Sequence, residues 1–164
     1  GPNEIAWDPV DRKLDPAALD GADALIHLGG AGIASGRWTD ARKQRIRDSR
    51  VVGTGLLAEA LVCPQNPPKV WVCASAVGYY GDRGDEILSE DAEPGRGFLP
   101  DVCRAWEEAT DPAIGAGIRV VGARFGMVLS RDGGAFPSSP LQKADLRPVG
   151  LLTDWCLYVL LGAE

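Results

Sequence analysis

The sequence is poor in the residues that build metal centres. Among its 164 residues His27 is the only histidine, and none of the four cysteines stands in a Cys-x-x-Cys pair. A protein zinc site needs several closely spaced Cys or His ligands, so this composition argues against one. Two of the cysteines, Cys73 and Cys103, fall inside apolar stretches, which favours buried, reduced thiols and a cytoplasmic protein.

Positive charge is also scarce. The chain has 17 Lys and Arg against 23 Asp and Glu, which gives a net charge of −6. Nucleic acids and anionic membranes bind basic surfaces, so neither is expected as a partner. Long hydrophobic runs are missing too, because the most apolar stretch, Val149–Ala163, is shorter than a membrane span and contains Asp154.

What remains is the composition of an ordinary globular domain, with 45% apolar and 24% charged residues. Near-continuous apolar runs predict buried strands, and apolar residues at helical spacing predict helices between them. In chain order these elements are a strand at 24–28, a helix at 38–61, a strand at 70–75, a helix at 99–110 and a strand at 118–123. This alternation predicts an α/β fold with a doubly wound parallel sheet in three layers, α/β/α.

The segment Val70–Gly81 carries the clearest candidate for a functional site. It is an apolar strand that ends in a turn of small residues with one hydroxyl and two phenols, namely Ser75, Tyr79 and Tyr80. Ligands of open parallel sheets bind at the carboxyl ends of the strands, so these groups predict an oxidoreductase-type site. The alternative is a buried strand followed by an ordinary glycine turn.

Several segments, in this order along the chain, together resemble the extended short-chain dehydrogenase/reductase superfamily. The match is densest with its atypical NAD-dependent epimerase/dehydratase group, and it covers roughly residues 5–135. The segments are Ala24–Ile33, Arg37–Thr39, Ser49–Thr54, Ser75–Gly81, Gly97–Leu99, Cys103–Glu107 and Arg124–Leu129. The resemblance implies a Rossmann domain that binds NAD or NADP, together with a smaller C-terminal substrate domain.

Two parts of the family pattern have no counterpart in this sequence. The glycine-rich phosphate loop that opens family domains is absent, and the residues after Ala135 do not match the substrate domain. We therefore expect an incomplete, Rossmann-like fold, with residues 1–135 as a partial NAD(P)-binding domain. Residues 136–164 are expected to form a divergent tail that is a remnant of, or a replacement for, the substrate domain.

The resemblance also implies roles for individual residues. Small residues in the turn after the strand at 24–28 would let the cofactor touch the backbone, and Ser75 would hydrogen-bond the substrate oxygen unless it is a strand-end cap. The implied catalytic residues are Ser75, Tyr79 and Tyr80. The implied cofactor-binding residues are Gly29, Gly30, Ala31, Gly32, Arg50, Thr54, Ala74 and Arg124.

The family's usual proton donor is the Tyr of a Tyr-x-x-x-Lys pair, which this sequence lacks. The matching positions hold Phe98 or Leu99 and Val102 or Cys103, so they offer neither a phenol nor an amine. Tyr79 or Tyr80 is then either a substitute acid or an aromatic packing residue.

Three further residues leave alternatives open or point away from a site. Arg124 would anchor either a substrate phosphate or a carboxylate of its own protein. Glu107 is expected on the helix surface, and His27 is expected as a satisfied core residue.

Two functions follow from these observations. The first is an NAD(P)-dependent oxidoreductase or epimerase that acts on a nucleotide sugar or another small carbinol or carbonyl compound, with little turnover expected from this chain by itself. The alternative is a non-catalytic Rossmann-like module that acts through protein contacts, including self-association through an exposed sheet edge. Binding of a nicotinamide dinucleotide distinguishes the two.

Overall fold

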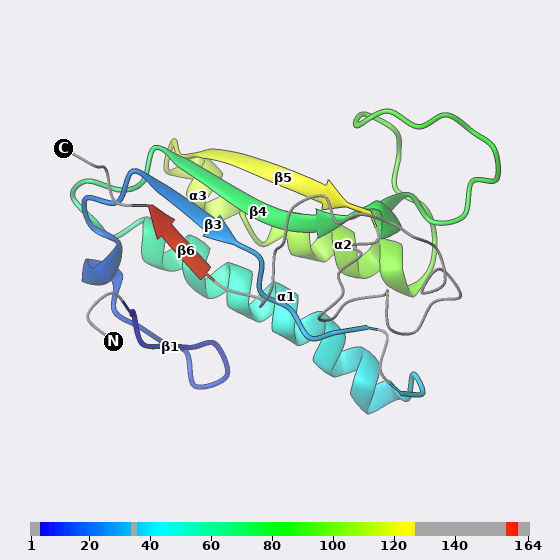
Figure 1. Cartoon of the computed structure of the whole chain (residues 1–164), viewed down its shortest axis with the longest axis horizontal. Coiled ribbons are helices and arrows are strands. Elements are labelled where there is room, and N and C mark those ends of the chain that lie inside the picture. Colours follow the sequence, from blue (N-terminus) through cyan, green and yellow to red (C-terminus); the bar gives the residue numbers. More distant parts are fainter. Residues whose placement is uncertain (1–3, 34–35, 127–156, 161–164) are drawn as a thin grey trace, which may run out of the picture.

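A parallel sheet organises the computed structural model, which describes residues 4–33, 36–126 and 157–160. The strand order is β5-β4-β3-β6 (Figure 1). The three parallel strands are β3 (Ala24–His27), β4 (Val70–Ala76) and β5 (Arg119–Phe125), and β6 (Leu157–Leu160) pairs antiparallel with β3. This arrangement confirms the predicted α/β class with an incomplete, Rossmann-like parallel sheet.

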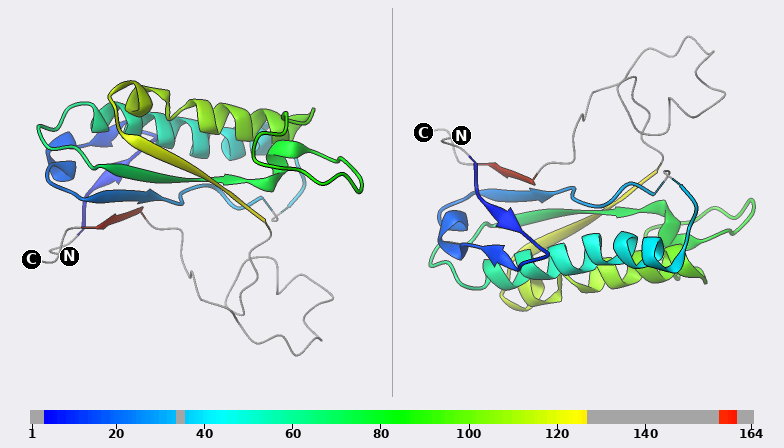
Figure 2. Two further views of the ribbon diagram at one scale, coloured as in Figure 1. Left: turned by 90° about the horizontal axis from the view of Figure 1, so that it is seen from above. Right: turned by 90° about the horizontal axis from the view of Figure 1, so that it is seen from below.

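The helices gather on one face of this sheet. They are α1 (Asp40–Leu61), α2 (Phe98–Glu108) and α3 (Asp111–Gly115), and all three lie on the same side in Figure 2. Within the described ranges no helix covers the opposite face. This part of the chain therefore forms two layers of the expected three-layer architecture.

The long helix α1 begins and ends where local signals place it. The side chain of Thr39 accepts a hydrogen bond from the Arg42 N–H at 3.3 Å and caps the first turn, which also carries Asp40. Its end at Leu61 precedes the prolines of the next loop, which cannot continue a helix. Among the described residues, no helix is both long enough and apolar enough to cross a membrane.

Short elements complete the described part of the chain. An antiparallel hairpin of β1 (Trp7–Asp8) and β2 (Lys13–Leu14) lies against α1, followed by a 3₁₀ turn, η1 (Pro16–Leu19). The Trp7 ring lies so close to Gly53 that a Cβ added there would stand 3.2 Å from it. The glycine in the middle of α1 therefore makes room for this indole.

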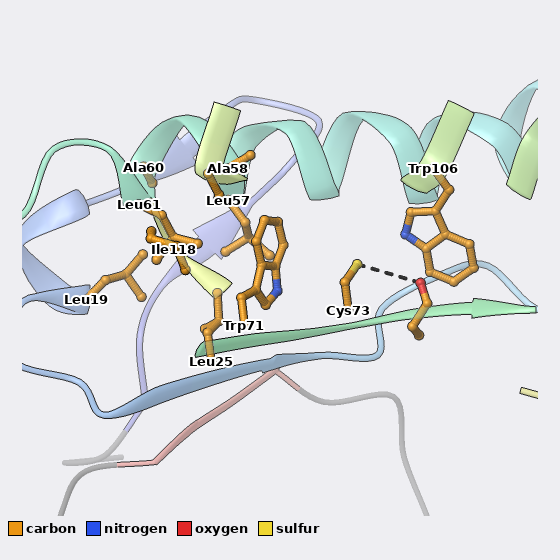
Figure 3. Close-up of a cluster of buried hydrophobic side chains, with 12 residues drawn as sticks. Leu19, Leu25, Leu57, Ala58, Ala60, Leu61, Trp71, Cys73, Trp106 and Ile118 are labelled. Carbon is orange, nitrogen blue, oxygen red and sulfur yellow. Dashed lines mark hydrogen bonds between the residues drawn. The ribbon is translucent and has the colours of Figure 1, made fainter. Parts of the chain in front are cut away.

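The core lies between the sheet and α1 (Figure 3). Leu25 of β3 and Trp71 of β4 meet Leu57 and Leu61 of α1, and none of these four side chains is exposed. Complete burial of such a side chain contributes about 2 kcal/mol from removal of apolar surface. This core holds the strands against α1 and α2. It therefore also sets the positions of the residues at the carboxyl ends of the strands.

Candidate functional site

The carboxyl ends of β3, β4 and β5 lie at the same edge of the sheet and bring the candidate residues together. The register places His27 beside Cys73 and Ser75 beside Arg124. The turn at Gly29–Gly32 follows β3, and a 3₁₀ turn, η2 (Val77–Tyr80), follows β4. This is the edge at which open parallel sheets bind ligands.

Glu107 is the centre of a hydrogen-bonded network at this edge. Its carboxylate accepts from the Ser75 hydroxyl at 2.6 Å and from the Arg124 guanidinium at 2.9 and 2.8 Å, through both carboxylate oxygens. The Glu107 and Arg124 side chains are 25% and 19% exposed, so water screens this two-point ion pair only in part. The network joins α2 to β4 and β5.

This pairing sets the charge of both partners. Burial acts to raise the pKa of Glu107, but hydrogen bonds from Arg124 and Ser75 outweigh it and leave that pKa below its ordinary value. The hydrogen bond to Glu107 raises the pKa of Arg124. Glu107 is therefore a carboxylate and Arg124 a guanidinium at neutral pH.

Both tyrosines of η2 contact Arg124. The Tyr79 ring stacks on the guanidinium, with Cζ of Arg124 at 3.6 Å from the ring centroid. The Tyr80 oxygen instead accepts a hydrogen bond from Nη1 of Arg124 at 2.8 Å, and the same nitrogen donates to the Glu90 carbonyl. The guanidinium therefore lies over both rings, closer to that of Tyr79, and it also donates to the Tyr80 oxygen.

A cavity of about 500 Å³ lies against this network. Tyr80, Glu107 and Arg124 line it together with Val77, Glu90 and Gly122. Ser75 is only 3% exposed, and its proton is directed at Glu107. The polar residues that line the cavity are thus Tyr80, Glu90, Glu107 and Arg124.

The glycine turn after β3 is close to two side chains. A Cβ added at Gly29 would lie 2.7 Å from the His27 ring, and one added at Gly30 would lie 3.1 Å from Cζ of Arg50. These two positions are glycine because neighbouring side chains occupy the space. A Cβ at Gly32 would meet nothing within 4 Å, so this exposed end of the turn is open to a ligand.

Three of the residues implied to bind the cofactor are buried. Thr54 has no exposed surface, and its hydroxyl accepts from Nε1 of Trp106 at 2.9 Å, so it supports the α1–α2 interface and leaves no surface for a dinucleotide. Arg50 is 7% exposed and lies against Trp106. Ala74 is 5% exposed and lines a neighbouring cavity of about 340 Å³ between β4, β5, α2 and α3, which shares Glu107 and Gly122 with the first.

Comparisons with known proteins find relatives of one kind. The chain is 44% identical over 131 residues to an epimerase family protein of Mycobacterium bovis, covering 80% of this chain and 43% of that protein. A crystal structure of a nucleoside-diphosphate sugar epimerase from Corynebacterium glutamicum superposes with a TM-score of 0.70 at 45% identity, covering 84% of this chain and 28% of that one. Over these residues the chain is similar to epimerase family proteins.

A human member of the epimerase family has been solved with NADPH. It superposes on this chain with a TM-score of 0.65 at 31% identity and covers 73% of this chain and 41% of the human one. The chain spans less than half of the length of the curated relatives that it matches. No family model matches the chain.

Glu107 is the residue that sequence reasoning missed. We expected a helix-surface acid, but Glu107 receives hydrogen bonds from two strands. A signal was present in the spacing: Glu107 follows Cys103 by four residues and so continues the buried face of α2. Of the two alternatives for Arg124, the structure shows a carboxylate of its own protein.

The expectation for His27 was wrong in one respect. The ring is buried, as expected for a core residue, but it is not satisfied: neither ring nitrogen has a hydrogen-bond partner among the described residues. The ring packs edge-on against Trp7, with centroids 5.6 Å apart. His27 is therefore held by apolar packing next to the glycine turn.

Proposed function

We propose that this protein is a nicotinamide-dinucleotide-dependent epimerase or oxidoreductase that binds NADP(H) or NAD(H) along the carboxyl ends of β3 and β4. The observation that carries this proposal is the network of Ser75, Glu107, Arg124 and Tyr80 beside a cavity at that edge. The human family member solved with NADPH supports a dinucleotide as the cofactor. The substrate class is a nucleotide sugar or another small carbinol or carbonyl compound.

The turn after β3 fits a dinucleotide at one end. Gly32 is exposed and has open space where a side chain would stand, which allows close approach of a ligand to the backbone. The N–H of Ala31 is already bound by the Ser49 hydroxyl at 2.9 Å, so Ala31 contributes shape rather than a donor. When bound, the dinucleotide supplies hydride transfer at its nicotinamide ring.

Tyr80 is the group we propose as proton donor to the substrate oxygen. Its oxygen accepts from Arg124, which leaves the phenolic proton free for a ligand in the cavity that Tyr80 lines. Ser75 is buried and donates its proton to Glu107, so its role in this proposal is to hold the Glu107 carboxylate in place beside the cavity. Tyr79 is assigned to packing, because Cζ of Arg124 lies over its ring at 3.6 Å from the centroid.

A second candidate is a module that acts only through protein contacts. One observation favours it: Arg124 and Ser75 direct their hydrogen bonds at groups of the protein itself, and so does the N–H of Ala31. These three groups need no ligand as a hydrogen-bond partner. The two candidates predict opposite results for dinucleotide binding.

Thermal unfolding with and without NADPH or NADH tests the proposal. A ligand at about 100 times its Kd stabilises the folded state by about 2.7 kcal/mol, which gives a clear rise in Tm. Gly32→Val should abolish that rise without lowering the Tm of the free protein, because the new side chain enters open space. Gly55→Ala, at another unobstructed glycine within α1, is the matched control and should keep the ligand-induced rise.

Absence of a rise with either dinucleotide would favour the second candidate. An unchanged rise in Gly32→Val would place the ligand away from the turn. If the rise is seen, consumption of the reduced dinucleotide in the presence of keto-sugar nucleotides or other small carbonyl compounds tests Tyr80, because the hydride and the Tyr80 proton together reduce the carbonyl to a carbinol. Tyr80→Phe should then lose turnover and keep dinucleotide binding, whereas Tyr79→Phe should keep both.

A further inference from the structure

Arg50 is a buried cation beside the glycine turn. It is 7% exposed, and among the described residues it forms no ion pair with a carboxylate. Burial lowers the pKa of its guanidinium, opposed by the nearby Cys103. Burying a charge without an ionic partner costs free energy, which the hydrogen bonds of Arg50 must offset.

Those hydrogen bonds go to the turn and to α1. Nη1 of Arg50 donates to the Ala31 carbonyl and to the Ile46 carbonyl, both at 3.0 Å. The preceding residue, Ser49, accepts from the Ala31 N–H at 2.9 Å and donates to the same Ile46 carbonyl. Two consecutive side chains of α1 thus bind both the N–H and the C=O of Ala31.

The other side of the guanidinium faces α2. Cζ of Arg50 lies 5.1 Å from the centroid of the Trp106 ring, and Trp106 is itself fixed by its hydrogen bond to Thr54. Trp106 directly precedes Glu107 in α2. Arg50 therefore lies between the glycine turn and α2, the helix that carries Glu107.

We propose that Arg50 is a positioning residue that holds the Gly29–Gly32 turn in its ligand-binding shape through the Ala31 carbonyl. This inference rests on the proposed function, because the turn is where we place the dinucleotide. It differs from a direct cofactor contact, since Arg50 acts through the backbone of Ala31. The glycine at position 30 fits this role, because a Cβ there would press on the guanidinium.

Amide hydrogen exchange tests the positioning role without any ligand. Arg50→Met keeps the apolar stem against Trp106 and removes the donors. Exchange of the Ala31 amide, which is hydrogen-bonded to Ser49, should then accelerate about tenfold. Amides in the middle of β4 should be unchanged in the same sample. Arg47→Met, at an exposed position of α1, is the matched control and should leave the turn as in the wild type.

Titration with NADPH and NADH tests the consequence for binding. Arg50→Met should raise the Kd about tenfold, and Arg50→Lys, which keeps a donor on a flexible stem, should give an intermediate Kd. Should Arg50→Met fail to fold, Arg50→Lys takes its place in the exchange experiment and should accelerate the Ala31 amide to a smaller degree, and no acceleration in that variant would overturn the positioning role.

The outcomes separate this inference from the proposed function. Unchanged exchange and Kd in Arg50→Met, or equal effects in Arg47→Met, would overturn the positioning role. Faster exchange at every amide, including β4, would overturn it as well, because it would show loss of global stability. A wild-type chain that binds neither dinucleotide would overturn the proposed function, while the exchange result would still decide whether Arg50 holds the turn.

Discussion

Acidification should destabilise this protein through one identifiable side chain, His27. It is 1% exposed, and burial lowers its pKa from 6.5 to about 4. No group among the described residues accepts from or donates to its ring nitrogens. The folded state therefore contains the neutral His27 ring, and the ring takes up a proton more readily once the chain has unfolded.

The sign and size of the effect follow from this difference in pKa. Below about pH 6.5 the unfolded chain takes up a proton that the folded chain refuses until about pH 4, so stability is full above pH 6.5 and falls as the pH drops toward 4. The slope approaches 1.4 kcal/mol per pH unit. Between pH 7 and pH 5 the loss is about 2 kcal/mol.

Urea unfolding at half-unit steps from pH 7 to pH 5 measures this loss. The window stays above the range in which most of the 23 carboxyl side chains titrate, and the sequence has no other histidine. His27→Leu, of similar volume and without a titrating group, should remove most of the slope. A wild type with a flat profile, or a His27→Leu variant with the full slope, would refute this account of the buried ring.

Further predictions concern the network, the glycines of α1 and the thiols. Glu107→Gln should lower the free energy of unfolding at pH 7 by about 2 kcal/mol, because Arg124 loses its ionic partner in a half-buried site. Glu108→Gln, whose side chain is 63% exposed and 3.9 Å from Arg104, should change it by less than about 0.5 kcal/mol, and equal losses in urea titrations would argue against the network. Gly55→Ala should raise the free energy of unfolding by about 1 kcal/mol. Gly53→Ala should raise it by less, because the new methyl group meets the Trp7 ring. Equal stabilisation of the two variants in thermal unfolding would contradict the close packing at Trp7. Iodoacetamide should modify Cys63 in the native protein and leave Cys73 and Cys103 unmodified until urea is added, because both are buried and burial raises the pKa of Cys73 to about 12. Peptide mass mapping reads this result, and native-state labelling of Cys73 would contradict the core described above.

Local signals in the sequence were enough to predict the main elements. Thr39 can cap a helix, and the prolines after Leu61 cannot continue one. Residues within a few positions of its ends therefore determine where α1 begins and ends. The parallel strands are short apolar runs flanked by turn residues. Their order, alternating with helices, specified a parallel sheet and hence the edge at which a site would lie.

The side-chain partners at that edge could not be predicted in the same way. Glu107 meets Ser75 and Arg124 only because β5 pairs with β4 in one register and α2 packs across both. The partners of Glu107 are far from it in the sequence, so neighbouring residues do not predict these contacts. Thr54 is the opposite case. Its motif implies contact with the cofactor, but in the packed fold its hydroxyl accepts a hydrogen bond from Trp106.

A titration of the ¹⁵N-labelled chain with NADPH, followed by amide chemical shifts, tests the central claim most directly. The account predicts saturable shifts at Gly29–Gly32 and at the end of β4 around Ala76–Gly78, with the outer surface of α1 unchanged. Absence of saturable shifts, or shifts confined to residues away from the carboxyl ends of the strands, would contradict a dinucleotide site at this edge.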